Sequence, residues 1–179
     1  MLIDRIAHRY AKSLYDLALE RNEADEIYRE VLALEELYEQ SRDLRVLLRS
    51  PVITAVRKAP IIDALFKGKI SELMRLFIVN LTRRSREDLL PQVLAEYRRQ
   101  YRKANNLTEA RLVTARPLPD PLKKELQAKL ESQLQTTIIF EEVTDPRVIG
   151  GFEVQIGTAL YDATVANSLR LVRREFSLN

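Results

Sequence analysis

Apolar residues recur at steps of three and four over the first hundred positions, the spacing of helices with one buried face. One stripe covers residues 3–18 and a second covers residues 27–38, with Asn22 as the expected end of the first helix. A short helix fits residues 41–50. Pro51 is expected to end that helix, because proline disfavours helical geometry at the preceding residue and lacks an amide donor.

The next stretch predicts two helices with recognisable ends. A fourth helix starts near Thr54, and Gly68 is expected to close it as a left-handed cap. Ser71 is the expected N-cap of a fifth helix that runs to about Arg83. The apolar stripe of this fifth helix covers more than half of its circumference, which predicts a buried central helix. The stripe consists of Leu73, Met74, Leu76, Phe77, Ile78, Val79 and Leu81.

A sixth helix follows, with Asp88 as its expected N-cap and Pro91 in its first turn. Asn105 and Asn106 mark its end. Its inner side carries Val93, Leu94, Tyr97 and Tyr101. Six helices joined by short turns predict an all-helical bundle over residues 1–105.

The hydrophobic period changes from helical to alternating in residues 106–179. Alternation over residues 109–114 and 152–156, and a β-branched run over residues 137–144, predict three strands. Asp145 and Pro146 turn the chain after the second strand.

Two helices complete this second region. Asp120 is expected to cap the first, and Pro121 opens it. Its expected core stripe, at steps of four, is Leu122, Leu126, Leu130 and Leu134. Val165, Leu169, Val172 and Phe176 predict the last helix. The predicted fold is therefore mainly α, with an N-terminal six-helix bundle followed by a small α/β domain over residues 106–179.

The composition argues against most catalytic chemistry. The 179 residues contain no cysteine and one histidine, His8, which is expected to be a surface residue. Thiolate nucleophiles, zinc–thiolate sites and iron–sulfur clusters are thereby excluded. Gly150 and Gly151 are the one adjacent glycine pair, and they suit a tight turn with positive backbone angles better than a phosphate loop. We expect no catalytic residue, no cofactor and no metal, and no apolar run is long enough for a membrane helix.

Basic residues are concentrated in the first region. Residues 1–105 carry 20 Lys and Arg against 16 Asp and Glu, a net charge of +4, whereas residues 106–179 carry 9 against 10, a net charge of −1. The densest basic run is Arg83, Arg84, Arg86, Arg98, Arg99, Arg102 and Lys103. A solvated helix face is the simpler interpretation, and a basic helical nucleic-acid-binding module is the alternative. Aromatic residues do not interleave with this run as base-stacking sites require.

The apolar surfaces offer a second kind of function. The first helix places Tyr10, Ala11 and Leu14 on one stripe, and the fifth helix has more apolar surface than one buried face needs. This pattern fits a groove that accepts a helix of another protein, and it fits an ordinary core equally well.

Three stretches carry a resemblance that spans the chain. They are RYAKSLYDLA at residues 9–18, LFIVNL with the following RRSR and LLP at residues 76–91, and DPRVIGGFEVQIG at residues 145–157. In this order they resemble the delta subunit of the bacterial F-type ATP synthase, the family of the mitochondrial oligomycin-sensitivity-conferring protein. The most specific part is the signature turn of Asp145, Pro146, Gly150 and Gly151. The chain departs from the family pattern at Thr158, where the family usually has Asp, and over residues 161–164.

The resemblance implies a non-catalytic stator subunit of the rotary F1Fo ATP synthase. It implies that the N-terminal bundle binds the N-terminal helix of the alpha subunit on the F1 head. It also implies that the C-terminal domain binds the b subunit or subunits of the peripheral stalk, which is anchored in the Fo membrane sector. By family analogy, the groove for the alpha-subunit helix lies between the first and fifth helices, at Tyr10, Ala11, Leu14, Leu76, Phe77 and Asn80.

The same resemblance implies where the protein acts. We expect a peripheral subunit at the cytoplasmic face of the bacterial plasma membrane, held there by protein partners, with no direct membrane insertion and no nucleic-acid partner. The opening residues are too acidic for a transit peptide, which favours a bacterial chain.

Overall fold

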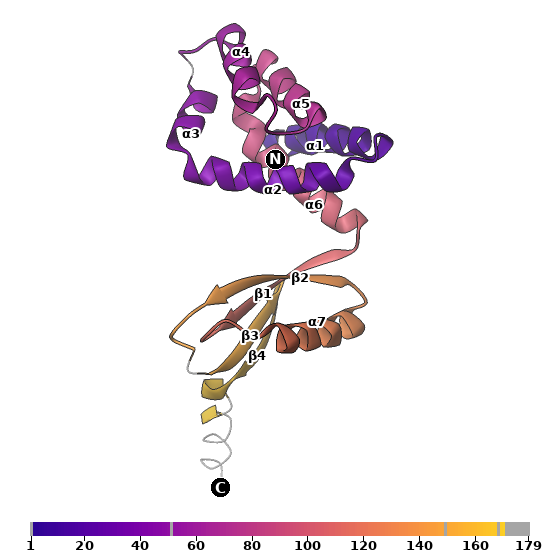
Figure 1. Cartoon of the computed structure of the whole chain (residues 1–179), viewed down its shortest axis with the longest axis vertical. Coiled ribbons are helices and arrows are strands. Elements are labelled where there is room, and N and C mark those ends of the chain that lie inside the picture. The colour runs from indigo at the N-terminus through magenta and orange to yellow at the C-terminus, as the bar shows by residue number, and fades with distance from the viewer. Residues whose placement is uncertain (1, 51, 149, 168, 171–179) are drawn as a thin grey trace. The chain divides into compact units, whose positions relative to one another are not determined.

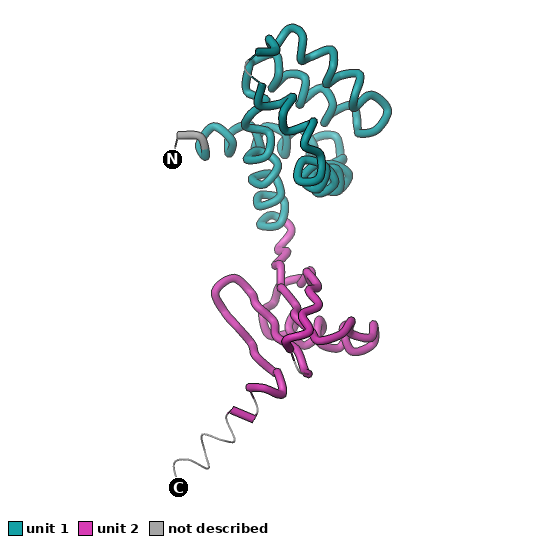
Figure 2. The backbone as a smooth tube through the Cα atoms, turned by 90° about the vertical axis from the view of Figure 1, so that its left-hand side faces the viewer, with its two compact units in different colours: residues 1–104 teal, residues 105–179 magenta. Residues whose placement is uncertain are grey.

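The chain forms two compact units, residues 1–104 (unit 1) and residues 105–179 (unit 2), coloured separately in Figure 2. The computed structural model describes residues 2–50, 52–148, 150–167 and 169–170. Within these residues the fold is mainly helical, with one small four-stranded sheet (Figure 1).

Unit 1 is entirely helical in the part that the structure describes. Its elements are α1 (Leu2–Glu20), α2 (Ala24–Gln40), α3 (Arg42–Arg49), α4 (Ala55–Phe66), α5 (Glu72–Arg83), the 3-10 turn η1 (Glu87–Leu89) and α6 (Leu90–Ala104). Local chemistry sets several ends as predicted. Asn22 and Gly68 have left-handed backbones, with φ of 57° and 71°, and the Ser71 hydroxyl accepts a hydrogen bond of 3.2 Å from the Met74 amide.

The start of the sixth helix differs from the sequence prediction. Asp88 is not an N-cap, because it lies inside the η1 turn that precedes α6. The neighbouring Glu87 explains the extra turn, since its side chain is buried against the interior instead of facing solvent. Pro91 is the second residue of α6, in its first turn as expected.

The core of unit 1 is built from all six helices. Its largest fully buried side chains are Leu14, Ile27, Val31, Leu48, Ile62, Met74, Ile78, Leu81, Leu94 and Tyr97. One charged pair lies among them: the Lys58 Nζ of α4 contacts the Glu87 Oε1 of η1 at 2.5 Å, and both side chains are less than a tenth exposed. Lys58 also donates to the Leu48 carbonyl of α3 at 3.1 Å, so one ammonium joins three elements.

Unit 2 contains β1 (Leu107–Thr114), α7 (Asp120–Leu134), β2 (Thr137–Thr144), β3 (Gly151–Ile156) and β4 (Ala159–Thr164). The strand order is β2-β1-β3-β4. Strands β1 and β2 are parallel, and α7 is the crossover that a parallel pair requires. The other two pairings, β1 with β3 and β3 with β4, are antiparallel.

Three sequence predictions for unit 2 need correction. The fourth strand, β4, was not expected, because it is an edge strand whose sequence shows no apolar alternation, and half of its residues are exposed. Asp120 is the first helical residue of α7 and not its cap, since Pro119 occupies the N-cap position. The leucines of α7 are not an enclosed core stripe: Leu122 and Leu134 are exposed.

The core of unit 2 is small. It consists of Ala110, Leu112, Ile138 and Val154, with Leu126, Leu130, Phe140, Phe152 and Ile156 partly buried around them. After β4 the backbone is helical at residues 165–167 and 169–170, at the start of the predicted last helix. Val172 and Phe176, which belong to the same prediction, lie outside the described residues.

Candidate helix-binding groove

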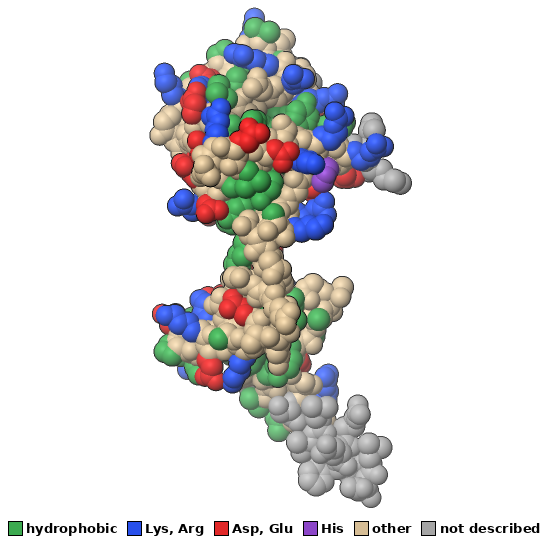
Figure 3. All heavy atoms as spheres, turned by 90° about the vertical axis from the view of Figure 1, so that its right-hand side faces the viewer, with side chains coloured by type: hydrophobic (Ala, Val, Ile, Leu, Met, Phe, Trp, Pro, Cys, Tyr) green, Lys and Arg blue, Asp and Glu red, His purple; other side chains and the backbone are tan. Residues whose placement is uncertain are grey.

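A groove of about 730 Å³ runs between α1 and α5 on unit 1. Its apolar lining is Ile6, Tyr10, Leu17, Leu73, Leu76, Phe77 and Leu81. Its polar lining is Arg9, Ser13, Arg21, Asn80, Arg84 and Arg86. Figure 3 shows one face of unit 1 on which hydrophobic side chains are exposed beside Lys and Arg side chains.

The spacing of small and large residues on α1 explains one wall of this groove. Ala7, Ala11, Leu14 and Ala18 face the core and are at most 2% exposed, and the alanines let α1 approach α6 closely. The residues one step round the helix, Ile6, Tyr10, Ser13 and Leu17, form the adjacent face and line the groove. Because α1 rests on α6, its groove-lining face stays open.

The second wall comes from α5, which has two apolar faces. One face is buried and contains Leu73, Met74, Ile78, Val79 and Leu81. The other face is open: Leu76 is 42% exposed and Asn80 is also exposed. The expectation of a buried central helix is therefore correct for one face and wrong for the other, because the wide apolar stripe covers core and groove together.

The structure separates the six predicted groove residues into two groups. Tyr10, Leu76, Phe77 and Asn80 line the groove. Ala11 and Leu14 do not, and both are fully buried on the core-facing side of α1. The rings of Tyr10 and Phe77 meet edge to face with centroids 6.4 Å apart, so one aromatic contact joins the two walls at the floor.

Sequence reasoning missed several lining residues. Ile6 and Ser13 lie one helical turn to either side of Tyr10, and Leu17 lies one turn further on, so projecting α1 from Tyr10 would have found them. Arg84 and Arg86 lie beyond the end of α5, where helical spacing no longer predicts direction. Asn80 is the one uncharged polar group that α5 contributes to the groove.

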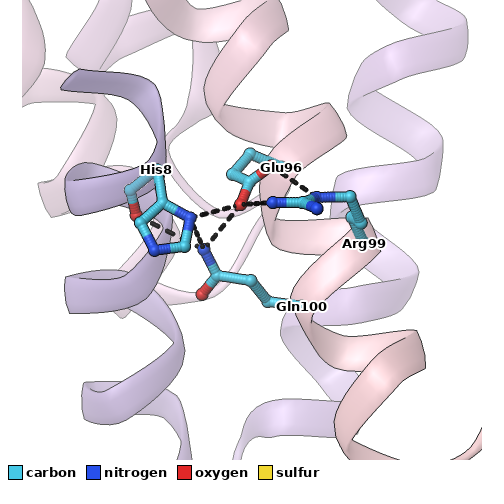
Figure 4. A network of polar contacts seen from close by, with 4 residues as sticks. All are labelled: His8, Glu96, Arg99 and Gln100. Carbon is cyan, nitrogen blue, oxygen red and sulfur yellow. Dashed lines mark hydrogen bonds and ion pairs between the residues drawn. The ribbon is translucent and has the colours of Figure 1, made fainter. Parts of the chain in front are cut away.

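A polar network fixes α1 against α6 beside the groove (Figure 4). The Glu96 carboxylate contacts His8 Nδ1 at 2.5 Å and accepts hydrogen bonds from Arg99 and Gln100. The Arg99 guanidinium is the main cause that lowers the pKa of Glu96 to about 2, with Gln100 and His8 adding to the effect. Glu96 is therefore ionised at neutral pH. The His8 side chain is about half exposed, which confirms the prediction that it is a surface residue.

The signature turn lies in unit 2, between β2 and β3, and is hydrogen-bonded to the end of β1. The Asp145 amide donates to the Thr114 carbonyl of β1, and the Asp145 carboxylate accepts hydrogen bonds from the Arg147 backbone and guanidinium. These bonds lower the pKa of Asp145 to about 2. Gly151 has the expected positive φ, 79°, but Gly150 does not. Pro146 follows Asp145 in this turn.

The basic run proposed for nucleic acid is partly occupied by protein contacts. Arg98 pairs with Glu35, Arg99 pairs with Glu96, and Arg102 donates to the Tyr28 hydroxyl. In the described ranges, no group of three acidic, His or Cys side chains is placed to hold a metal ion. None of the helices described in the structure has the length and hydropathy of a membrane span.

Comparison with known proteins identifies the family. Residues 6–176 match the sequence profile of the ATP synthase delta (OSCP) subunit. A protein named ATP synthase subunit delta from Parabacteroides distasonis is 33% identical over 97% of this chain and 96% of its own length. Another protein of that name, from Phocaeicola vulgatus, is 32% identical over 98% of this chain and 96% of its own length.

The fold is also similar to that of a chain in a solved ATP synthase structure. A chain in the cryo-EM structure of the Toxoplasma gondii mitochondrial ATP synthase hexamer superposes with a TM-score of 0.67 and 22% identity, over 95% of this chain and 96% of that one. The match to the family profile covers nearly the whole sequence, including both walls of the groove and the signature turn. The chain therefore belongs to the family of the ATP synthase delta (OSCP) subunit, a structural stalk subunit of the complex and not a catalytic one.

Proposed function

We propose that unit 1 binds the N-terminal helix of the alpha subunit in the groove between α1 and α5, and that unit 2 binds the b subunit or subunits of the peripheral stalk. In this assignment the F1-binding domain is residues 1–105 and the stalk-binding domain is residues 106–179. The chain then links the F1 head to the Fo-anchored stalk at the cytoplasmic face of the bacterial plasma membrane, so that rotation is coupled to ATP synthesis.

The observation that carries the proposal is an apolar groove that is open on the surface of the isolated chain. Leu76 is 42% exposed in the middle of α5, opposite a wall that includes Ile6 and Leu17 of α1. Helix-in-groove recognition uses such a surface, with apolar residues of the partner at helical spacing as anchors. A second helix in the groove would remove this apolar surface from water.

A joint in the stator has to resist torque, and two properties of the groove favour this: its broad apolar surface and its fixed wall helices. A broad apolar contact lowers the dissociation rate, because burial must be undone before the partner leaves. The wall helices are themselves fixed: α1 is tied to α6 through Glu96, and the Arg75 side chain of α5 pairs with Asp63 of α4. A partner helix held between fixed walls would transmit force with little movement.

Unit 2 offers its own surface for the stalk. A hollow of about 380 Å³ is lined by Leu118, Leu122, Leu126, Leu130, Phe152, Tyr161 and three polar or charged residues of α7, Glu125, Lys129 and Gln133. Leu122 is 54% exposed and Tyr161 is 62% exposed, so the small core leaves apolar surface for a partner to cover. The location of the b-subunit contact within unit 2 is part of the same proposal.

Calorimetric titration tests the groove assignment. The full chain is titrated with a synthetic peptide of the alpha-subunit N-terminal helix from the same organism, at physiological salt. We expect one site with a negative heat-capacity change, the mark of apolar burial. Leu76→Asp is expected to weaken binding at least tenfold, because it places a carboxylate in the apolar floor.

Leu37→Asp is the matched control. Leu37 lies on α2 outside the groove lining and is 41% exposed, nearly the same as Leu76. It receives the same change in charge and size, so it should bind the peptide as the unaltered chain does. Equal weakening by both substitutions, with circular dichroism showing both variants folded, would contradict the groove assignment.

A further inference from the structure

The two walls of the helix groove carry arginines and no carboxylates. Arg9 and Arg21 lie on the α1 side, and Arg84 and Arg86 lie on the α5 side just past the end of that helix. The lining includes no Asp or Glu. The three carboxylates of α1, Asp4, Asp16 and Glu20, are exposed but do not line the groove.

These four arginines also lack ion-pair partners among the residues that the structure describes. Other arginines of unit 1 are paired at the surface: Arg75 with Asp63 and Glu72, and Arg99 with Glu96. All four groove arginines are exposed. A partner that supplies carboxylates can therefore form ion pairs here without first breaking existing ones.

The length of the groove limits the size of the partner. Its α1 wall extends from Ile6 to Arg21, a rise of about 22 Å, which corresponds to about four helical turns. An occupant helix lying along this wall presents one apolar stripe to the floor. Its flanking positions then face the arginines of both walls.

We propose that the groove selects an amphipathic helix of about four turns that carries carboxylates on both flanks of its apolar stripe. The inference rests on the function proposed above and specifies the charge pattern of the partner. The apolar floor supplies burial, whereas the arginines at the rim speed association and discriminate against helices with basic flanks. Because the arginines are exposed, their contribution is screened by salt.

The test measures how binding of the alpha-subunit peptide to the full chain depends on rim charge and on salt. The variant Arg84→Glu/Arg86→Glu reverses two charges on one wall, and Arg42→Glu/Arg49→Glu makes the same change on α3, outside the groove. We expect the first variant to slow association about tenfold at low salt and the control to change it less than twofold. We also expect the difference to shrink as salt is raised towards 0.5 M.

A second experiment reverses the charge of the acidic residues in the peptide. Replacing its Asp and Glu residues by Lys should weaken binding to the unaltered chain, because all four arginines then repel the peptide. The loss should be smaller with Arg84→Glu/Arg86→Glu, which reverses the charge on one of the two walls. Binding that is tight but independent of salt and of both charge reversals would overturn this inference and leave the groove assignment intact. Absence of binding by the unaltered peptide at every salt concentration would instead overturn the groove assignment, and this inference with it.

Discussion

The two units bury hydrophobic residues to very different extents. Of the buried hydrophobic residues that the structure describes, 24 lie in unit 1 and five lie in unit 2. In unit 1 the six helices enclose a core that includes a charged pair. In unit 2 the helix α7 has no buried residue, and the sheet is joined mainly through its backbone pairings.

This difference indicates where each unit is sensitive to substitution. The stability of unit 1 depends on the side chains of its core, because their packing supplies most of the buried surface. The stability of unit 2 depends more on its backbone geometry, since its small core can compensate for little loss of strand pairing. Both units keep apolar surface open, and in both it lies where we propose that a partner binds.

The largest expected effect tests the interior of unit 1. Lys58→Met should destabilise the unit by about 3 to 5 kcal/mol, because it leaves the Glu87 carboxylate buried without its counter-charge. The Glu87 Oε2 already lacks a hydrogen-bond partner among the described residues, so no other group is in place to compensate. Hydrogen exchange of α4 and α6 amides measures the loss.

The double variant Lys58→Met/Glu87→Met is the control for this prediction. Replacing both charges with apolar side chains should recover most of the stability, because the cost lies in the unpaired charge and not in the lost attraction. Some loss should persist, since the Leu48 carbonyl no longer accepts from Lys58. If the single and double variants are equally unstable, the pair contributes through packing alone.

An intermediate effect tests the backbone of unit 2. Gly151→Ala should destabilise the sheet by at least about 2 kcal/mol, because φ is 79° and a Cβ would lie 2.2 Å from the Ala163 carbonyl oxygen. The clash falls on the pairing of β3 with β4, where Gly151 is opposite Thr164. Hydrogen exchange should show loss of protection in these strands while the helices of unit 1 are unchanged.

The variant Gly157→Ala tests how much of the Gly151→Ala effect comes from the positive φ alone, without the steric clash. Gly157 also has a positive φ, 57°, but a Cβ there meets nothing within 4 Å. Its substitution should cost only about 1 kcal/mol, the penalty of a left-handed residue. Equal losses at both glycines would mean that conformation alone, without the close approach to Ala163, sets the sensitivity of unit 2.

The sequence predicted those features that local chemistry determines. Asn22, Gly68 and Ser71 set helix ends through backbone conformation or a hydroxyl cap, and the strand at 137–144 was placed at its observed ends. Strand β4 escaped prediction because its pairing with β3, and not its own pattern, makes it a strand. Asp88 and Asp120 failed as caps because their neighbours determine where the helices begin.

The groove was predictable in outline and not in detail. Family resemblance indicated the first and fifth helices, and Tyr10, Leu76, Phe77 and Asn80 do line the groove. Leu14 is buried instead, because α1 has two adjacent apolar faces and only the position of α6 decides which one is covered. The arginines beyond α5 were seen as part of a basic run, since no helical period connects them to the groove.

The smallest expected effect compares surface ion pairs in the two units. Glu96→Gln should destabilise unit 1 by about 0.5 to 1 kcal/mol at neutral pH, because Glu96 joins His8 of α1 to Arg99 and Gln100 of α6. The pKa of Glu96 falls from 4.5 to about 2 on folding, so its ionised form is favoured by the native state. The stabilisation is therefore complete above about pH 4.5 and is lost as the pH falls through about 2. Hydrogen exchange of α1 and α6 amides at pH 7 and pH 3 measures it.

Glu125→Gln is the counterpart in unit 2. Glu125 is also paired, with Lys129, but both residues belong to α7, so the pair ties no element to another. Its removal should change exchange within α7 only slightly and leave the sheet amides unaffected, because an exposed pair within one helix adds little. If Glu96→Gln has no larger effect than Glu125→Gln, the polar network does not fix α1 against α6. The apolar contacts of α1 with the core, including those of Ala7, Ala11 and Leu14, would then hold this wall of the groove.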